Sequence, residues 1–371
     1  MSVPCRNAIK NLHRYVAAES LEDLERRFGV PRIIKLAGNE NMLGCSPLAQ
    51  KAIRETAGQL YRYPDISCNR IRDKVAERLN VPKESLVFGN GLFEVLSLIA
   101  QCYLEPGTES VFSAKSFGWY KTMTQKMGAA LVEVPQTEDY RTDLDGMLDR
   151  VTPRTRVVWL CNPNNPTGTI FAKEQFELFL QKLPKDVLAV LDEAYCDFAD
   201  AGVLPDSLAL QKKHDNLVVL RTFSKVYGLA GLRIGYGIAS PEIVHVLEQI
   251  RPSSSVNRTA QAAACACLDD EDFRNVSIEN NFQGKKLYQS RLEKLGLGFL
   301  PTQSNFIMVN TGIDSASLVK EYLEKGFLLR GGDEFGMPGW LRITIGTPEQ
   351  NERVLDILED ILKRWGGKVP R

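Results

Sequence analysis

Residues 217–236 read LVVLRTFSKVYGLAGLRIGY. The segment 217–220 is an apolar run with the length and β-branched content of a buried strand. It ends in a glycine-rich turn with hydroxyl side chains, Lys225 and Arg233, and a second short apolar run follows at 234–236. In an open α/β sheet, ligands bind beyond the carboxyl ends of the strands, so this turn is a candidate site.

Short apolar runs of the same kind alternate with helix-length amphipathic stretches from about residue 85 to residue 250. This alternation is typical of strands that are joined by crossover helices in a parallel sheet. The predicted strands are residues 86–88, 110–112, 131–134, 157–160, 188–191, 217–220 and 234–236. We therefore expect an α/β fold with a mostly parallel seven-stranded central sheet and helices on both faces.

The pattern changes after residue 252 and predicts a smaller α+β domain. A long helical region precedes a strand at 305–309, a helix near 315–325, a strand at 341–345 and a final helix. Two domains also suit a chain of 371 residues, which is long for one core. We expect an N-terminal arm with part of the small domain at 1–45, a large domain at 46–255, and an interdomain helix with the C-terminal small domain at 256–371.

The composition excludes several classes of partner. Basic and acidic residues both total 46, so no net field attracts nucleic acid or a membrane surface. The eight cysteines form no CxxC pair, which favours reduced thiols, and the three histidines lack the spacing of a metal site, so we expect no metal. The first residues lack the apolar core of a signal peptide, and no later run approaches ~20 apolar residues. We expect a cytoplasmic protein.

Three further strand ends carry unusual polar turns. Residues 89–94 read GNGLFE, a turn that would present backbone N–H groups at the start of a helix. Residues 161–168 read CNPNNPTG, which suits a rigidly held amide. Asp192 begins the sequence DEAY at the end of a buried strand, where a carboxylate is destabilising unless it meets a cation. Read together with the Lys225 turn, these motifs indicate a site that carries chemistry.

The ordered set NPNNPTG, DEAY and FSKVYGLAGLRIGY resembles the class I and II aminotransferases, which are fold-type-I pyridoxal-phosphate enzymes. Within them the chain is most similar to the histidinol-phosphate aminotransferases. That closer likeness rests on KLAGNEN at 35–41, RYPD at 62–65, LLR at 328–330 and LRITIG at 341–346. The similarity extends from about residue 12 to the end, and it implies the fold-type-I fold and a pyridoxal 5'-phosphate cofactor.

The resemblance assigns the cofactor chemistry to residues at the strand ends. Lys225 would bond covalently to the cofactor aldehyde and later move a proton between substrate and cofactor. Asp192 would hold the pyridine nitrogen protonated, while Asn165 and Tyr195 would hydrogen-bond the phenolic oxygen. Phe117 would stack on the ring. Lys225, Asp192 and Tyr195 are therefore the expected catalytic residues.

The resemblance also implies how the cofactor phosphate is held. It predicts contacts from the N–H groups of Gly91, Leu92 and Phe93, the hydroxyls of Thr222 and Ser224, and the guanidinium of Arg233. Tyr63 would reach the phosphate from a neighbouring subunit. The expected assembly is therefore a homodimer in which each active site needs both chains.

Four residues are implied at the substrate. Arg342 matches the family residue for the acidic end of the substrate, and Arg330 matches the second anion contact; planar bidentate donors suit carboxylate and phosphate alike. The alternative is that both are solvated arginines of an edge strand. Tyr15 and Asn39 resemble family positions near the substrate, although Asn39 could equally be a turn residue.

The implied reaction is a ping-pong transamination in which 2-oxoglutarate collects the nitrogen that the donor leaves. Histidinol phosphate is the first candidate donor, giving imidazole acetol phosphate and glutamate in histidine biosynthesis, and an aromatic amino acid such as phenylalanine is the second. A lyase similar to threonine-phosphate decarboxylase is a further alternative.

Departures from the family pattern fall near the substrate and leave the donor open. They are Leu92-Phe93 in the glycine-rich turn, the bulky Trp119, and RPSSSVN at 251–257.

Overall fold

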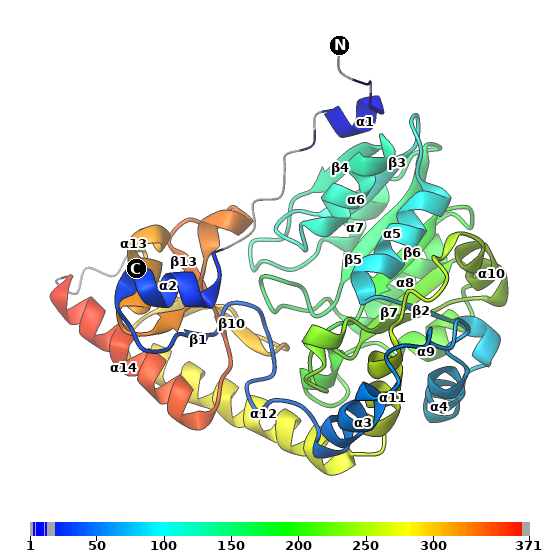
Figure 1. Ribbon diagram of the computed structural model, residues 1–371. Coiled ribbons are helices and arrows are strands. Elements are labelled where there is room, and N and C mark those ends of the chain that lie inside the picture. Colours follow the sequence, from blue (N-terminus) through cyan, green and yellow to red (C-terminus); the bar gives the residue numbers. More distant parts are fainter. Residues whose placement is uncertain (1–2, 4, 11, 13–18, 366–371) are drawn as a thin grey trace.

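The seven predicted strands form one sheet (Figure 1) in the computed structural model, which describes residues 3, 5–10, 12 and 19–365. They are β2 (Leu86–Gly89), β3 (Glu109–Ser113), β4 (Ala130–Val134), β5 (Thr155–Cys161), β6 (Leu188–Asp192), β7 (Leu217–Thr222) and β8 (Gly235–Ile238). Their order is β2-β8-β7-β6-β5-β3-β4. Strand β8 is antiparallel to both neighbours, and the other pairs are parallel. The predicted α/β class with a mostly parallel sheet is confirmed.

Helices cover both faces of this sheet. Successive side chains of a strand point to opposite faces, so the apolar strands present apolar residues on both. In β7, Leu217 and Val219 pack on one face, whereas Val218 and Leu220 pack on the other. The first face is covered by α3 (Pro47–Ala57), α4 (Asn69–Leu79), α7 (Leu144–Asp149), α8 (Lys173–Lys182), α9 (Ser207–Gln211) and α11 (Arg258–Cys267). The second face is covered by α5 (Leu92–Tyr103), α6 (Trp119–Met127) and α10 (Pro241–Ile250).

A second, smaller sheet is built from the C-terminal part of the chain. Its strand order is β12 (Arg330–Gly331), β13 (Trp340–Thr344), β10 (Phe306–Asn310) and β9 (Gly298–Phe299). Helices α13 (Ser315–Glu324) and α14 (Pro348–Arg364) pack on it around a separate apolar core. The predicted strands and helices of this region are therefore present.

The N-terminal segment joins this smaller unit. Strand β1 (Ile34–Lys35) pairs in parallel with β11 (Phe327–Leu328), and α2 (Leu21–Phe28) packs nearby. The short elements are α1 (Asn7–Lys10) and the 3-10 turns η1 (Lys83–Ser85), η2 (Cys196–Phe198), η3 (Ala230–Leu232) and η4 (Gly332–Phe335). The exact division at residues 45 and 255 stays a prediction. Within the described residues, no helix is long and apolar enough to cross a membrane.

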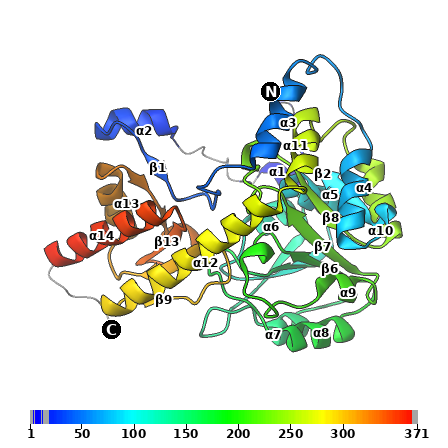
Figure 2. The same cartoon turned by 90° about the horizontal axis from the view of Figure 1, so that it is seen from below.

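Helix α12 (Glu271–Lys294) connects the two sheets (Figure 2). Near its start, Arg274 forms an ion pair at 2.8 Å with Asp197, which lies in η2 just after β6 of the large sheet. Near its end, Arg291 pairs with Glu352 of α14 at 2.9 Å. The middle of the helix packs tightly, since a Cβ at Gly284 would lie 2.4 Å from Ile345. These contacts hold the small sheet at the carboxyl edge of the large one.

The carboxyl ends of three central strands meet at that edge. Cys161 of β5 pairs with Asp192 of β6, and Asp192 pairs with Leu220 of β7. The motifs that follow these strands are therefore brought together by the sheet register.

Gly228 fixes the turn that carries Lys225. Its φ is +68°, in the left-handed region, and a Cβ at this position would lie 1.9 Å from the carbonyl oxygen of Gly44. Its N–H donates to the carbonyl of Lys225 at 3.0 Å. Only glycine at position 228 lets the turn lie this close to the N-terminal segment.

We predict that Gly228→Ala lowers the midpoint of thermal unfolding far more than Gly296→Ala. Both place alanine in a left-handed conformation, which costs about 1–2 kcal/mol, but Gly296 has no heavy atom within 4 Å of the added Cβ, so only the first variant adds a backbone clash. Circular dichroism melts of the wild type and both variants test this. Equal midpoints for the variants would contradict it.

Candidate active site

Asp192 lies at the end of β6 and is 4% exposed. Its Oδ2 accepts a hydrogen bond from the Tyr120 hydroxyl at 2.9 Å, and its Oδ1 accepts one from the Ala194 N–H at 3.0 Å. Burial raises the pKa of the Asp192 carboxyl to about 6, and these hydrogen bonds oppose the rise. In the described part of the chain, no basic side chain forms an ion pair with this carboxylate.

The Lys225 amine lies close to this carboxylate and to the N-terminal segment. Its Nζ donates to the Gly38 carbonyl at 3.1 Å and lies 5.5 Å from the centroid of the Tyr195 ring. Burial of the amine lowers the pKa of Lys225 to about 8, and the positive charge of Arg342 acts in the same direction. The amine therefore reaches its neutral, nucleophilic form at a lower pH than an ordinary lysine.

A buried chain of hydrogen bonds links four of the predicted residues. The Tyr195 hydroxyl accepts from Asn39 Nδ2 at 3.1 Å and from Asn165 Nδ2 at 3.3 Å. Asn165 Oδ1 in turn accepts from Arg342 Nη1 at 2.6 Å. All four residues are buried. Asn39, with a φ of 55°, thus has both the backbone of a turn residue and a side chain in the site.

Arg342 is 6% exposed, so the solvated-arginine alternative is wrong for this residue. Its Nη2 donates to the Ala37 carbonyl at 2.6 Å, and its guanidinium lies 5.3 Å from the Phe306 ring and 5.0 Å from the Phe335 ring. Burial lowers the pKa of Arg342 to about 10. Its Nε is buried without a hydrogen-bond partner among the described residues. An unused donor on a buried cation suits an anionic ligand.

The predicted phosphate-binding residues follow the ends of β2 and β7, the two strands on either side of β8. Gly89 of β2 and Thr222 of β7 both pair with Gly235 of β8. Gly91 follows with a φ of +74°, and a Cβ there would lie 2.4 Å from Arg233 Nη2. The glycine therefore lets the guanidinium approach the N-terminus of α5, where backbone N–H groups favour an anion.

Leu92 and Ser224 add backbone groups to the same region. Leu92 is the first residue of α5, and its N would lie 2.9 Å from a Cβ built on Gly235. Ser224 is buried, and its N–H donates to the Thr222 hydroxyl at 3.0 Å.

The aromatic residues divide into two groups. Phe117 packs edge-on against Tyr120 at 5.6 Å, beside the Asp192 carboxylate. Phe93 is 37% exposed and packs instead against Trp119 at 4.4 Å. The bulk that departs from the family pattern is therefore placed on the surface side of α5 and α6.

Among the described residues, Tyr63 and Arg330 form no hydrogen bond with the Tyr195 network. Tyr63 is 86% exposed, and its carbonyl accepts a hydrogen bond from Arg258 at 2.6 Å. Arg330 forms an ion pair with Glu334. Tyr15 lies outside the described residues.

Tyr120 and the backbone carbonyls at positions 37 and 38 contribute to the site but were not predicted from the motifs. Tyr120 follows Phe117 by three positions, so a helical turn places both near the strand end, and that spacing was an available signal. The carbonyls of Ala37 and Gly38 accept from Arg342 and Lys225, respectively. Backbone acceptors leave no mark on residue type, so no sequence signal pointed to them.

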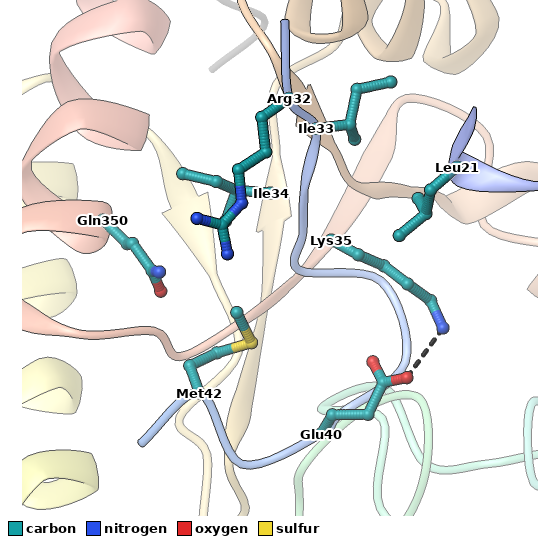
Figure 3. A pocket seen from close by; sticks show the side chains of 8 residues that line it. All are labelled: Leu21, Arg32, Ile33, Ile34, Lys35, Glu40, Met42 and Gln350. Carbon is teal, nitrogen blue, oxygen red and sulfur yellow. Dashed lines mark hydrogen bonds and ion pairs between the residues drawn. The ribbon is translucent and has the colours of Figure 1, made fainter. Parts of the chain in front are cut away.

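The same N-terminal loop borders a cavity of about 400 Å³ on which Glu40 and Lys35 form an ion pair at 2.7 Å (Figure 3). Leu21, Ile33 and Met42 supply apolar lining. The reactive amine does not line this cavity, so we do not assign it to the active site.

The residues present fit the phosphate-bearing aldehyde cofactor that the motifs imply. The buried Asp192 carboxylate forms no ion pair among the described residues, and a protonated ring nitrogen would supply the opposite charge. At Gly91 the missing side chain leaves room for the Arg233 guanidinium beside the N-terminus of α5, where a phosphate would meet both its charge and the backbone N–H groups. The Lys225 amine interacts electrostatically with both Asp192 and Arg233, so it lies within the field of both features.

The family of the chain follows from comparison with known proteins. Residues 31–358 match the family model described as aminotransferase class I and II. The chain therefore belongs to the class I and II aminotransferase family, and the predicted aminotransferase class is confirmed.

Individual relatives are histidinol-phosphate aminotransferases. Those of Moorella thermoacetica and a Geobacillus species are 45% and 42% identical, each over 96% of this chain and over 93% and 98% of their own lengths. Among solved structures, the histidinol-phosphate aminotransferase of Sinorhizobium meliloti in complex with pyridoxal-5'-phosphate is 29% identical, with a TM-score of 0.88, covering 97% of this chain and 98% of that one. The predicted likeness to this group is confirmed.

Folding raises the pKa of Asp192 from 3.8 to about 6. We therefore predict that Asp192→Asn is stabilised relative to the wild type, and that this difference grows as the pH rises across that window in the cofactor-free protein. Across this window the unfolded chain loses its proton more readily than the folded one, so the wild type loses stability while the amide does not. Thermal midpoints measured at several pH values give the difference between the two proteins.

Asp200→Asn is the matched control. Although burial opposes it, hydrogen bonds from Gln303 and Lys285 lower the pKa of this carboxyl below 3.8. Its stabilising effect is lost as the pH falls below 3.8, so Asp200→Asn should show little trend between pH 3.8 and about 6 and the opposite trend below that window. If the difference in thermal midpoint between Asp192→Asn and the wild type stays constant with pH, the pKa of the buried Asp192 carboxyl is not raised.

Proposed function

We propose that this aminotransferase uses pyridoxal phosphate to transfer the amino group of histidinol phosphate to 2-oxoglutarate. The observation that carries the proposal is the buried chain from Arg342 through Asn165 to Tyr195, whose ring faces the reactive amine. It supports the proposal because a guanidinium that could bind an anion interacts electrostatically with the amine that would react. Relatives named for this substrate, 45% and 42% identical over 96% of the chain, support the donor.

When bound, pyridoxal phosphate supplies an aldehyde that captures the donor amine and a ring that accepts electrons from the substrate bond. Asp192 would keep the ring nitrogen protonated. Its two oxygens are fixed by Tyr120 and Ala194, so the carboxylate is already oriented, and contact with a cation would offset its burial.

Lys225 would act first as the nucleophile and then as the general base and acid. A pKa of about 8 lies near neutral pH, which suits an amine that must both take and return a proton. When the amine is free, the Gly38 carbonyl orients it at 3.1 Å. Burial raises the pKa of Tyr195, so its hydroxyl stays protonated and can donate to the phenolic oxygen.

The two arginines of the small sheet would bind the anionic end of the substrate. Arg342 and Arg330 are register partners on neighbouring strands. Each has a buried Nε without a partner among the described residues. Three phosphate oxygens could use donors from both guanidiniums.

The donor is tested by titrating the loaded protein with histidinol phosphate and, in parallel, with phenylalanine. We expect histidinol phosphate to remove the visible absorption band of the cofactor at much lower concentration, because its phosphate, with three terminal oxygens, can bind both arginines, whereas the carboxylate of phenylalanine has only two oxygens. Carbon dioxide release without a keto-acid requirement would favour the lyase instead. Loss of the band with phenylalanine alone would keep the reaction and change the substrate.

We also propose a homodimer in which Tyr63 completes the active site of the neighbouring chain. Tyr63 and the nearby Tyr61 and Leu60 are 86%, 78% and 66% exposed, which is unusual for adjacent large apolar residues. Arg258 donates a hydrogen bond to the Tyr63 carbonyl and so holds the backbone from which the Tyr63 side chain projects.

Hybrid dimers test this arrangement. Lys225→Ala and Tyr63→Ala chains are each expected to have little activity. If Tyr63 serves the other chain, each hybrid has one intact site, and random mixing restores about a quarter of wild-type activity. No recovery in dimers that have exchanged subunits would place Tyr63 outside the neighbouring site.

We propose a cytoplasmic location as well. All eight cysteines are free, and four of them are buried. Reduced thiols suit a reducing compartment.

A further inference from the structure

Glu334 brings a negative charge to the part of the site that should bind an anion. It lies in η4, the turn between β12 and β13, and forms an ion pair with Arg330. Arg330 faces Arg342 across the two strands. A substrate anion that binds both arginines therefore meets a carboxylate already in contact with one of them.

The backbone holds Glu334 in this place. The Met337 N–H donates to the Gly332 carbonyl at 3.0 Å, and a Cβ at Gly332 would lie 2.2 Å from the carbonyl oxygen of Met337. The same turn places the Phe335 ring 5.0 Å from the Arg342 guanidinium. One turn thus lines both arginines, and within it the half-exposed Glu334 side chain contacts Arg330.

Glu334 does not satisfy the two arginines fully. The Nε atoms of Arg330 and Arg342 are both buried without a partner among the described residues, even with the ion pair formed. The side chains of Arg330 and Glu334 are 41% and 54% exposed, so the pair is solvated and weak enough for a ligand to break.

We propose that Glu334 is a specificity-determining residue that competes with the anionic end of the substrate for Arg330. The inference rests on the proposed function. A phosphate has enough oxygens to reach both guanidiniums and must displace Glu334 from Arg330, whereas the single carboxylate of an amino-acid donor such as phenylalanine can be held by Arg342 alone and leaves the Arg330–Glu334 ion pair intact. Glu334 therefore reduces the preference for phosphate donors over carboxylate donors.

Glu334→Gln tests this role. We expect KM for histidinol phosphate to fall about two- to fivefold, the range of an exposed ion pair, with little change in KM for phenylalanine. The change should appear in KM rather than kcat, because Glu334 touches no reacting atom. The control is Glu352→Gln, which removes a carboxylate from an arginine pair at 2.9 Å on the outer surface of α14 and should alter neither KM.

Binding of inorganic phosphate to the pyridoxal-phosphate-loaded protein gives a second readout, measured by calorimetry. Glu334→Gln should tighten it by the same factor, and Glu352→Gln should not. An unchanged or weaker affinity in Glu334→Gln, or equal changes in KM for both donors, would overturn the inference. If no variant uses histidinol phosphate, the proposed donor is wrong, and the phosphate titration still decides the role of Glu334.

Discussion

Asp192 carries its carboxylate at the end of a central strand, where 4% of the residue is exposed. A charge in such a place is destabilising unless hydrogen bonds and an opposite charge compensate for the lost water. The protein supplies the hydrogen bonds through Tyr120 and Ala194 but leaves the charge without a basic partner among the described residues. The buried carboxylate therefore lowers the stability of the cofactor-free fold and favours binding of a ligand with a cationic atom. The stacked rings of Tyr120 and Trp159, 5.5 Å apart, keep the carboxylate dry and fixed.

The second constraint is the contact between the two sheets. Arg342 comes from the small sheet, yet its guanidinium hydrogen-bonds Asn165, which follows a strand of the large one. Asn39 approaches from the N-terminal segment and reaches Tyr195. Because these contacts are buried and made by charged or amide groups, losing one leaves its partner unsatisfied. The relative position of the two sheets thus depends on the same side chains that are proposed to bind the substrate.

The fold was predictable from sequence because each central strand is an apolar run bounded by turn residues. The antiparallel direction of β8 was not, since apolar pattern says nothing about strand direction. Lys225 and Asp192 were found because the chemistry of a parallel sheet collects at strand ends. Tyr120 could have been found from its spacing to Phe117, but residue type alone does not show that its hydroxyl meets Asp192. The proposed role of Tyr63 would depend on a second chain.

The charges of the site explain how a neutral protein can bind anions. Acidic and basic residues both total 46, so no long-range field concentrates the substrate. Selection must therefore come from contacts, and Arg342 and Arg330 are set in register to provide them. Burial makes the Arg342 contact strong, whereas Arg330 is half-exposed and shared with Glu334. In the proposed function, the buried Arg342 would hold the anion of every substrate, and the half-exposed Arg330 would contact only the larger phosphate.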